Sequence, residues 1–243
     1  MTDDQGGGRV VARQLWRDVL YLSWRYPPAL LRKVVPPEMD LDLHAGWAWA
    51  GVALHGVQGS VMTGMPPSLG LDFSQAEVRV YVRAGGRSGV WSLSIDADHR
   101  LAVTLGRLAT GLPYRRAHLR IQPQGHVFDQ DVERLGDGRA RLRIRWEVGD
   151  PLPAVPGSLP HFLLSRDARF TRRLGRVWRV DARQALPQPR DAFVLVREGG
   201  LIAAAGLPRP TEPPLAIYDE GRTVEWLAPA LVRSAPPTYA APN

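Results

Sequence analysis

Glycine and proline interrupt this chain so often that a long helix has little room in it. The 243 residues include 24 glycines and 22 prolines. Proline removes a backbone donor and glycine destabilises a helix interior, so both favour turns. The segments between them are short and either apolar or alternating, as strands are. The sequence therefore predicts a mainly β domain (a β-rich α+β chain) with many turns and a few short helices.

The clearest strand pattern is a hairpin over residues 76–96, AEVRVYVRAGGRSGVWSLSID. Its first arm alternates, as a strand with two different faces does. One face carries Val78, Val80 and Val82, and the other carries Glu77, Arg79, Tyr81 and Arg83. The segment AGGRS supplies the turn, because glycine adopts the positive φ angles of tight hairpins.

Further elements follow from the same signals. Strands are predicted over residues 15–24, 46–57, 117–122, 126–135, 139–148 and 216–229. Helices are predicted over 29–35, over 99–109 with Asp98 as N-terminal cap, and from a Ser158 cap to Phe170. The second helix would have Leu101, Leu105 and Leu108 on its apolar side.

The composition indicates a cytoplasmic protein. The chain has no cysteine, whereas disulfides are typical of oxidising compartments. Its first residues, MTDDQGGG, are acidic and glycine-rich, unlike a secretory leader. No apolar run approaches the roughly 20 residues that a membrane-spanning helix needs, so no membrane partner is expected. We expect a single domain (13–234) between flexible ends (1–12 and 235–243).

The basic residues are almost all arginines. Thirty-one basic and 24 acidic side chains give a formal net charge of +7, and Lys33 is the only lysine. Arginine stays charged and is poorly suited to forming imines. Imine chemistry is therefore nearly absent from this chain.

Three stretches resemble a known family. Residues 73–121, FSQAEVRVYVRAGGRSGVWSLSIDADHRLAVTLGRLATGLPYRRAHLRI, resemble the signature region of the uncharacterised YqjF-like proteins, and YDEGRTVEWL (218–227) fits their closing strand. That group belongs to the acetoacetate decarboxylase-like superfamily, and ALLRKVVPPEMDLD (29–42) is similar to a segment near the start of the decarboxylases. The resemblance implies a closed barrel or cone of mostly antiparallel strands around a buried, funnel-like pocket.

The resemblance also implies a specific loss in that pocket. In the decarboxylases the helix after the hairpin ends in proline and two lysines, the first of which forms a Schiff base with the substrate. Here Pro113 is followed by Tyr114 and Arg115. Lys33 falls where the decarboxylases carry a lysine that is not the Schiff base. We therefore expect chemistry that uses neither an imine nor a cofactor.

Resemblance and side-chain chemistry together predict an anion site. Arg17 falls where the decarboxylases have an arginine near the substrate, and Glu77 lies close to one of their pocket glutamates. An arginine fork can hold a carboxylate, a buried glutamate can transfer a proton, and a tyrosine hydroxyl can stabilise an enolate. The predicted catalytic residues are Glu77 and Tyr114, and the predicted substrate-binding residues are Arg17, Arg79, Tyr81 and Arg115. The partner would be a small anionic metabolite of the oxo-acid type.

Three functions stay open on this basis: an imine-independent lyase or decarboxylase, a binding protein that has kept only the pocket, and a basic interaction module. The module would use the Arg139–Arg145 strand face, where four arginines alternate with apolar residues and could follow a nucleic-acid backbone. Asp131 and Glu133 on the neighbouring strand oppose some of these arginines. That favours a solvated strand face and no nucleic-acid partner.

Several smaller motifs also have a purely structural interpretation. Glu77 and Arg79 could pair with each other on a solvated face, with Arg115 at the surface. The segment DADH (96–99) offers close-spaced metal ligands, but a helix cap accounts for its Asp98, so no metal is predicted. His55 fits a hydrogen-bonded core histidine better than a ligand. The resemblance also allows a homo-oligomer.

Overall fold

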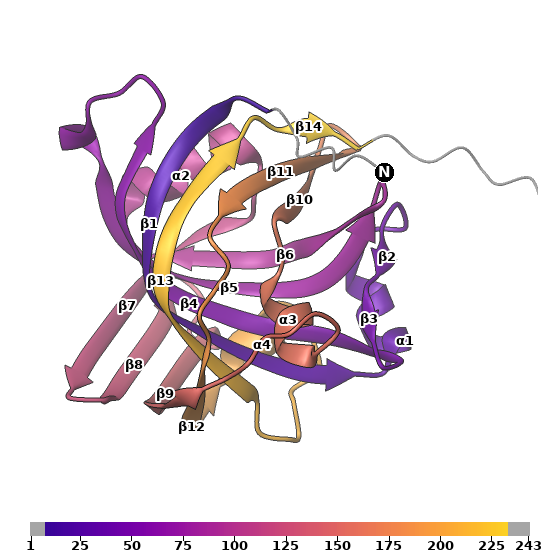
Figure 1. Cartoon of the computed structure of the whole chain (residues 1–243), viewed down its shortest axis with the longest axis vertical. Helices are drawn as coiled ribbons and strands as arrows, with labels where there is room; N and C mark the ends of the chain where they lie inside the picture. The colour runs from indigo at the N-terminus through magenta and orange to yellow at the C-terminus, as the bar shows by residue number, and fades with distance from the viewer. Residues whose placement is uncertain (1–7, 233–243) are drawn as a thin grey trace, which may run out of the picture.

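The computed structural model describes residues 8–232, which fold mainly into strands (Figure 1). The long strands are β1 (Val10–Tyr26), β4 (Trp47–Met62), β5 (Leu71–Ala84), β6 (Arg87–Ala97), β7 (Tyr114–Gln124), β8 (Val127–Arg134), β9 (Arg141–Pro151), β10 (Ala168–Arg173), β11 (Arg176–Gln184), β12 (Arg190–Gly199) and β13 (Leu215–Leu227). The short strands are β2 (Asp40–Leu41), β3 (Leu43–His44) and β14 (Ala230–Leu231). The helices are α1 (Pro28–Leu31), α2 (Arg100–Thr110), α3 (Leu159–Leu164) and α4 (Gly200–Ala204), with single 3₁₀ turns η1 (Arg32–Val34) and η2 (Pro67–Leu69).

Both ends of the predicted domain lie close to the limits of the described residues. Residues 1–7 and the predicted C-terminal tail, 235–243, lie outside them. Residues 10–12, which the sequence assigned to a flexible end, already belong to β1 and pair with β13 and β4.

Strand pairing closes the sheet on itself twice. The nine-strand ring consists of β1, β4, β5, β6, β7, β8, β9, β12 and β13. The seven-strand ring consists of β1, β4, β5, β6, β10, β11 and β13. In the described part of the chain, only β6–β7 and β6–β10 pair in parallel. The prediction of a mainly β, closed and mostly antiparallel fold is confirmed.

Five strands, β1, β4, β5, β6 and β13, belong to both rings and have a packed interior on each side. On β5, Val78 and Val80 pack into the core that contains Trp146 of β9. Tyr81 of the same strand packs into a second core with Tyr21 of β1. Since successive side chains of a strand point to opposite faces, β5 contributes alternately to the two interiors.

A tight turn joins β5 to β6 as predicted. Gly85 and Gly86 have φ angles of 54° and 74°, and the flanking residues Ala84 and Arg87 pair with each other. Two successive positive φ angles are the requirement of a two-residue hairpin turn.

The helices differ from the predictions in their ends and faces. His99, not Asp98, caps α2, because its Nδ1 accepts the backbone N–H of Ala102 at 3.3 Å. Asp98 instead accepts a hydrogen bond from the backbone N–H of Ser74 at 2.9 Å. The predicted helix from Ser158 to Phe170 ends at Leu164, since the following segment forms β10 beside β6.

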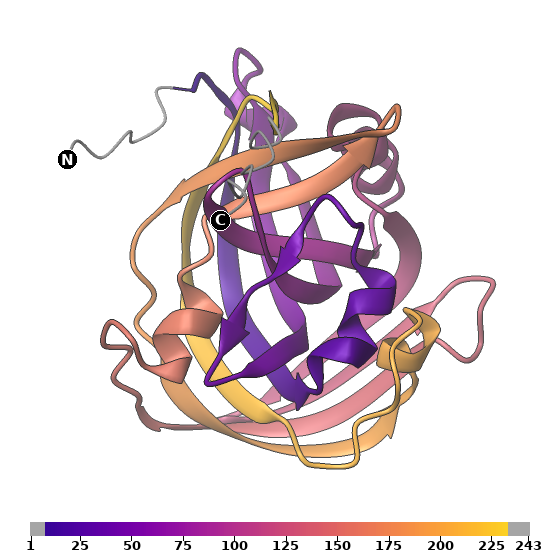
Figure 2. The same cartoon turned by 90° about the vertical axis from the view of Figure 1, so that its right-hand side faces the viewer.

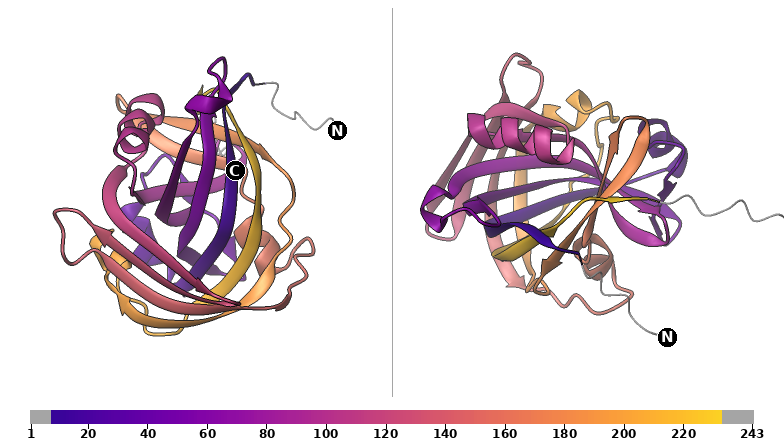
Figure 3. Two further views of the ribbon diagram at one scale, coloured as in Figure 1. Left: turned by 90° about the vertical axis from the view of Figure 1, so that its left-hand side faces the viewer. Right: turned by 90° about the horizontal axis from the view of Figure 1, so that it is seen from above.

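The predicted apolar side of α2 is also wrong as a core face. Leu101, Leu105 and Leu108 are 49%, 40% and 69% exposed, whereas Ala102 and Val103 are buried. Figures 1, 2 and 3 show α2 at one end of the sheet, away from the end that carries α1 and α3. No helix within residues 8–232 is long and apolar enough to cross a membrane.

A buried ion pair connects β6 to β8 across the intervening β7. Nε and Nη2 of Arg134 donate to Oδ1 and Oδ2 of Asp96 at 2.7 and 2.9 Å. The two side chains are 7% and 0% exposed. A bidentate pair of this kind is strong and directional, so it fixes the strands around the parallel β6–β7 step.

Asp96→Ala is expected to lower the free energy of unfolding by about 3 kcal/mol, because it removes the bidentate partner of the buried Arg134 and leaves only the more distant, partly exposed Asp137, at 3.8 Å. Glu133→Ala is the control, since it removes the partner of Arg141 near the surface and should cost much less. Urea unfolding measures both. Equal losses in the two variants would contradict the role given to the Asp96–Arg134 pair.

Candidate functional site

The polar face of β5 is buried inside the seven-strand ring. Glu77 and Tyr81 are 0% exposed and Arg79 is 6% exposed. The alternative that Glu77 and Arg79 lie on a solvated face is therefore wrong. A buried charge needs an opposite charge or full hydrogen bonding, so the neighbours of these residues define the candidate site.

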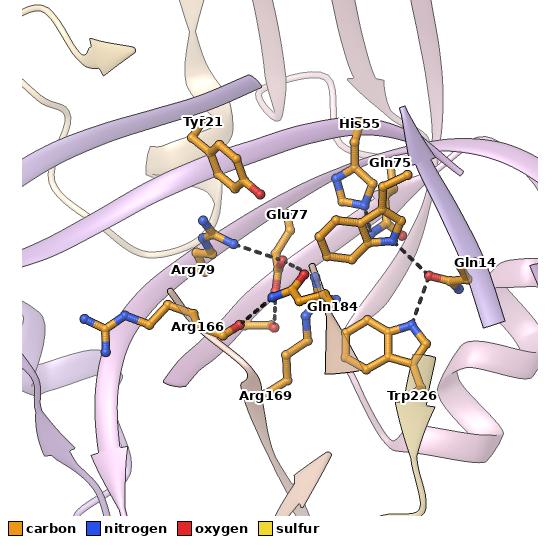
Figure 4. A network of polar contacts seen from close by, with 12 residues as sticks. Gln14, Tyr21, His55, Gln75, Glu77, Arg79, Arg166, Arg169, Gln184 and Trp226 are labelled. Atoms are coloured by element: carbon orange, nitrogen blue, oxygen red, sulfur yellow. Dashed lines mark hydrogen bonds and ion pairs between the residues drawn. The ribbon is translucent and has the colours of Figure 1, made fainter. Parts of the chain in front are cut away.

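Glu77 is the centre of this network (Figure 4). Its Oε1 accepts a hydrogen bond from the Ser92 hydroxyl at 2.5 Å. Its Oε2 lies 2.9 Å from Nη2 of Arg169 and 3.9 Å from Nη1 of Arg79. Ser92 belongs to β6 and Arg169 to β10, so three strands of the seven-strand ring converge on one carboxylate.

Aromatic side chains surround Arg79. Its guanidinium carbon lies 4.9 Å from the Tyr21 ring centroid and 5.5 Å from that of Tyr81, within cation–π range. Burial by itself lowers the pKa of Arg79, but attraction to Tyr81, Glu77 and Tyr21 outweighs it and raises the pKa. Arg79 therefore stays charged inside the protein.

Each of two other arginines of this interior lies beside a carboxylate other than Glu77. Nη1 of Arg166 lies 2.5 Å from Oδ2 of Asp42. Nη2 of Arg222 lies 3.2 Å from Oδ2 of Asp219. Asp42 also lies 3.5 Å from Nη2 of the exposed Arg83, so each of these two buried arginines has a carboxylate beside it, one of them shared with the surface.

Arg79 and Arg169, by contrast, share a single carboxylate. Within residues 8–232, Glu77 is the one acidic side chain at ion-pair distance from either of them. Nε of Arg79 is buried and has no hydrogen-bond partner there. The network consequently holds one more positive than negative charge.

His55 lies beside this charge cluster as a neutral side chain. Its ring centroid is 4.3 Å from that of Trp16, and its Nε2 lies 2.9 Å from the side-chain nitrogen of Gln75, which donates to it. Burial lowers the pKa of His55 well below its usual value, and nearby arginines, Arg169 first among them, lower it further. His55 is thus a hydrogen-bonded core histidine, as predicted.

Gln14 fixes two tryptophans next to Arg169. Its Oε1 accepts from Nε1 of Trp16 at 3.1 Å and from Nε1 of Trp226 at 3.0 Å, while its amide nitrogen donates to Ser60. Figure 4 shows the Trp226 indole joined to this amide by a dashed line. The guanidinium carbon of Arg169 lies 5.5 and 4.9 Å from the two indole centroids.

Tyr114 reaches the site from the first position of β7. Its aromatic side chain packs so closely on Gly106 of α2 that a Cβ there would lie 2.6 Å from Cε2. Gly111, with φ 71°, ends α2 and turns the chain toward Tyr114. Burial raises the pKa of Tyr114, with Arg169 opposing and Glu77 adding to the effect. Its hydroxyl is therefore a hydrogen-bond donor at neutral pH.

Two cavities meet at Arg169 and Trp226. The larger, of about 200 Å³, lies under α2 and extends to Tyr114. The smaller, of about 20 Å³, is lined by Arg79, Arg166 and Arg169 and has room for about one water molecule. An engineered cavity of roughly 150 Å³ accommodates benzene, so the larger cavity can hold an organic ligand.

Arg17 and Arg115 do not enter this interior. Both are exposed, and Nε of Arg17 donates to the Gln58 side chain at 3.3 Å. Each follows an aromatic residue that points inward, Trp16 or Tyr114, so alternation along the strand sends it outward. The structure does not place them with Glu77, and the arginine beside that carboxylate is Arg169.

Arg169 and Ser92 are absent from the predicted site. Arg169 falls in a segment predicted as helix, and its inward position depends on the parallel pairing with Val90 of β6, which no local pattern encodes. Ser92 lies on the second arm of the predicted hairpin and pairs with Arg79. The register of the predicted hairpin, which places Ser92 opposite Arg79, could have identified it from the sequence.

The arginine-rich face of β9 is largely paired. Arg141 forms an ion pair with Glu133, and Nε of Arg143 lies 3.3 Å from Oδ1 of Asp131. Arg139 precedes the strand and is exposed. These pairs are the ones that the sequence led us to expect.

The DADH segment makes no metal centre. Asp96 is the counter-ion of Arg134, Asp98 holds a backbone N–H of β5, and His99 caps α2. No group of three or more His, Cys, Asp or Glu side chains in the described range is placed to hold a metal ion.

Gly106→Ala is expected to destabilise the protein, because the added methyl group collides with Tyr114. In a Tyr114→Ala background the same substitution is expected to stabilise it by up to about 1 kcal/mol, since alanine is the better helix former. Denaturant unfolding of the four proteins measures this reversal of sign. The same sign in both backgrounds would show that Tyr114 does not pack on Gly106.

His55 is expected to make stability depend on pH. Below about pH 6.5 the unfolded chain binds a proton at this histidine that the folded chain excludes. The free energy of unfolding therefore decreases as the pH is lowered, by up to about 1.4 kcal/mol per pH unit. His55→Gln should remove this component, whereas His118→Gln, on the exposed side of β7, should retain it. Urea unfolding at pH 7, 6 and 5 compares them; identical profiles for wild type and His55→Gln would contradict the assignment.

Sequence comparison identifies relatives over most of the chain. Residues 13–223 match the DUF2071 family, described as an uncharacterized conserved protein. The chain is 27% identical over 218 residues to the uncharacterized protein YqjF of Bacillus subtilis (strain 168), which covers 88% of this chain and 89% of YqjF.

Solved structures are similar in fold at low identity. Acetoacetate decarboxylase from Legionella pneumophila has a TM-score of 0.63 at 15% identity, over 95% of this chain and 89% of its own. The enduracididine biosynthesis enzyme MppR, in complex with pyruvate, has a TM-score of 0.59 at 13% identity, over 95% and 94%. These likenesses establish the fold and nothing further. On the family match, this chain belongs to the DUF2071 family of YqjF-like proteins and has an acetoacetate decarboxylase-like fold.

Proposed function

We propose that this protein binds a small carboxylated metabolite of the oxo-acid type in the cavity under α2, with Arg169 and Tyr114 as its polar contacts. We propose further that Glu77 and Tyr114 support enolisation, lyase or decarboxylation chemistry there without an imine. Arg79 and Tyr81 would support Glu77 and would not contact the ligand themselves. The exposed Arg17 and Arg115 would take no part in binding or in the reaction.

The excess of positive charge around Glu77 is the observation that carries this proposal. Arg79 and Arg169 are 6% and 5% exposed, and one carboxylate serves both. An uncompensated buried charge is costly. An anion in the adjoining cavity would neutralise it, and a guanidinium group can hold a carboxylate through two parallel hydrogen bonds.

The proposed chemistry uses Tyr114 and Arg169, which line the cavity, and Glu77, which lines neither cavity but lies 2.9 Å from Nη2 of Arg169. Glu77 would take a proton from the carbon next to the carbonyl, and the electron pair would move to the carbonyl oxygen. The Tyr114 hydroxyl and Arg169 would stabilise the resulting enolate oxygen. Lys33, the only lysine, is exposed on η1, which supports a route without a lysine imine.

The similar folds lend general support. MppR has been crystallised in complex with pyruvate, a small oxo-acid, and acetoacetate decarboxylase is named for an oxo-acid substrate. Both belong to this fold at identities of 15% or less, so they support the substrate class only by analogy.

A second candidate is a binding protein without catalysis. Glu77 is held by Ser92 at 2.5 Å and by Arg169 at 2.9 Å, as a purely structural counter-ion would be. The basic interaction module is the weaker alternative, since Glu133 and Asp131 pair with the arginines of β9.

A panel of small oxo-acids at millimolar concentration is expected to contain one that raises the melting temperature of the wild type. Arg169→Gln should abolish the shift. Arg172→Gln is the matched control, because Arg172 is on the same strand but pairs with Glu38 near the surface. An acid that stabilises Arg169→Gln as much as wild type would contradict binding at Arg169, and the absence of any hit would contradict the pocket.

The Tyr114→Phe variant distinguishes a catalytic function from binding without catalysis. It keeps the aromatic packing on Gly106 and removes only the hydroxyl. Turnover of the bound acid is expected to fall about 100-fold or more, as when one oxyanion donor is lost, while the thermal shift persists. Binding by the wild type with no turnover would favour the non-catalytic function.

A further inference from the structure

The mouth of the cavity under α2 is apolar and open to water. Its rim carries Met62, Met65, Leu69, Leu101 and Leu105, which are between 40% and 56% exposed. Exposed apolar patches of this kind commonly mark ligand-binding grooves. Methionine side chains adapt their shape to what they contact. Leu101 and Leu105 of α2 thus have a reason to be exposed, because they line the mouth of this cavity.

The wall between this mouth and the inner end offers few free polar groups. The Thr110 hydroxyl donates to the Gly106 carbonyl at 2.6 Å, and the Gln14 amide is used by two tryptophans and Ser60. The Tyr114 hydroxyl makes no hydrogen bond within residues 8–232. Tyr114 and Arg169 are therefore the groups left to meet a polar ligand atom, together with the O–H of Ser60, which accepts a hydrogen bond from Gln14 but donates none within residues 8–232.

A more spacious hollow beside Trp24, of about 640 Å³, lacks this combination. Its charged residues Arg25, Arg209 and Glu212 are all exposed, and Arg25 lies 3.0 Å from Glu212. The cavity under α2 differs in joining an apolar mouth to a buried guanidinium group.

We infer that the acid bound by this protein is amphiphilic, with a carboxylate head at Arg169 and Tyr114 and an apolar tail under α2. This inference rests on the proposed function and narrows its substrate class. A cavity of about 200 Å³ corresponds to about six to eight carbon-sized groups at roughly 30 Å³ each. The tail lies against Phe73, Leu105 and Leu112, and its far end reaches the methionines of the rim.

A short acid such as pyruvate leaves most of this wall in contact with water. Each methylene that becomes buried strengthens binding by about fourfold. The cavity therefore selects ligands by the length of the apolar chain, and Arg169 selects them by their carboxylate head group.

The test is calorimetric titration with butanoate, hexanoate, octanoate and decanoate below their micelle concentrations. The affinity is expected to rise about fourfold per methylene up to about eight carbons and then to level off. Octan-1-ol has the same tail without the charge. It is expected to bind at least about tenfold more weakly than octanoate, since it lacks the charge-assisted bonds to Arg169.

Two tryptophan substitutions on α2 locate the tail. Leu105→Trp fills the cavity mouth and is expected to remove the advantage of octanoate over butanoate. Leu108→Trp adds the same bulk one turn away, at a residue that does not line the cavity, and should leave the advantage intact. Circular dichroism confirms that both variants fold.

The outcomes of these experiments distinguish a failure of this inference from a failure of the proposed function. Equal affinity for butanoate and octanoate, with Arg169→Gln still abolishing binding, would overturn the tail and leave the carboxylate site standing. An undiminished chain-length effect in Leu105→Trp would overturn its location under α2. Failure of every acid to bind would overturn both proposals.

Discussion

Five strands shared between two closed rings are the constraint on which this structure depends. A shared strand faces a packed interior on each side over much of its length, so its buried side chains enter one interior or the other, whereas a few, such as Arg17 of β1 and Arg83 of β5, stay exposed. On β5 the valines enter the core of the nine-strand ring, and Glu77, Arg79 and Tyr81 enter the seven-strand ring. Charged groups in such a place must be neutralised by their neighbours.

The seven-strand ring meets that demand incompletely. Arg166 and Arg222 lie beside Asp42 and Asp219, but the buried Arg79 and Arg169 have only Glu77 at ion-pair distance within residues 8–232. The remaining positive charge lies where a cavity opens under α2, and the walls of that cavity are apolar. This combination is the basis on which we propose an anion with an apolar body as the ligand. It links the charge balance of the core to the exposure of leucines and methionines at the mouth of the cavity.

Local sequence patterns predicted part of this site. The alternation of β5 and the glycine turn at Gly85 and Gly86 were readable directly, and Tyr114 followed from the resemblance at the end of α2. Arg17 was misplaced because it follows the inward-pointing Trp16 and so faces outward. Arg169 was missed because its segment reads as helix, and it enters the site only through a parallel pairing with β6, far away in the sequence.

The sequence by itself determined the local elements, the family and the chemical repertoire. It gives a mainly β chain, one lysine, no cysteine, and a tyrosine at the position where the resemblance implies a nucleophile. Only the tertiary structure decided that the polar face of β5 is buried and that Arg169 shares Glu77 with Arg79. It also decided that Leu101 and Leu105 of α2 border a cavity. A period of two residues shows that a strand has two faces, but closure of the sheet decides what each face meets.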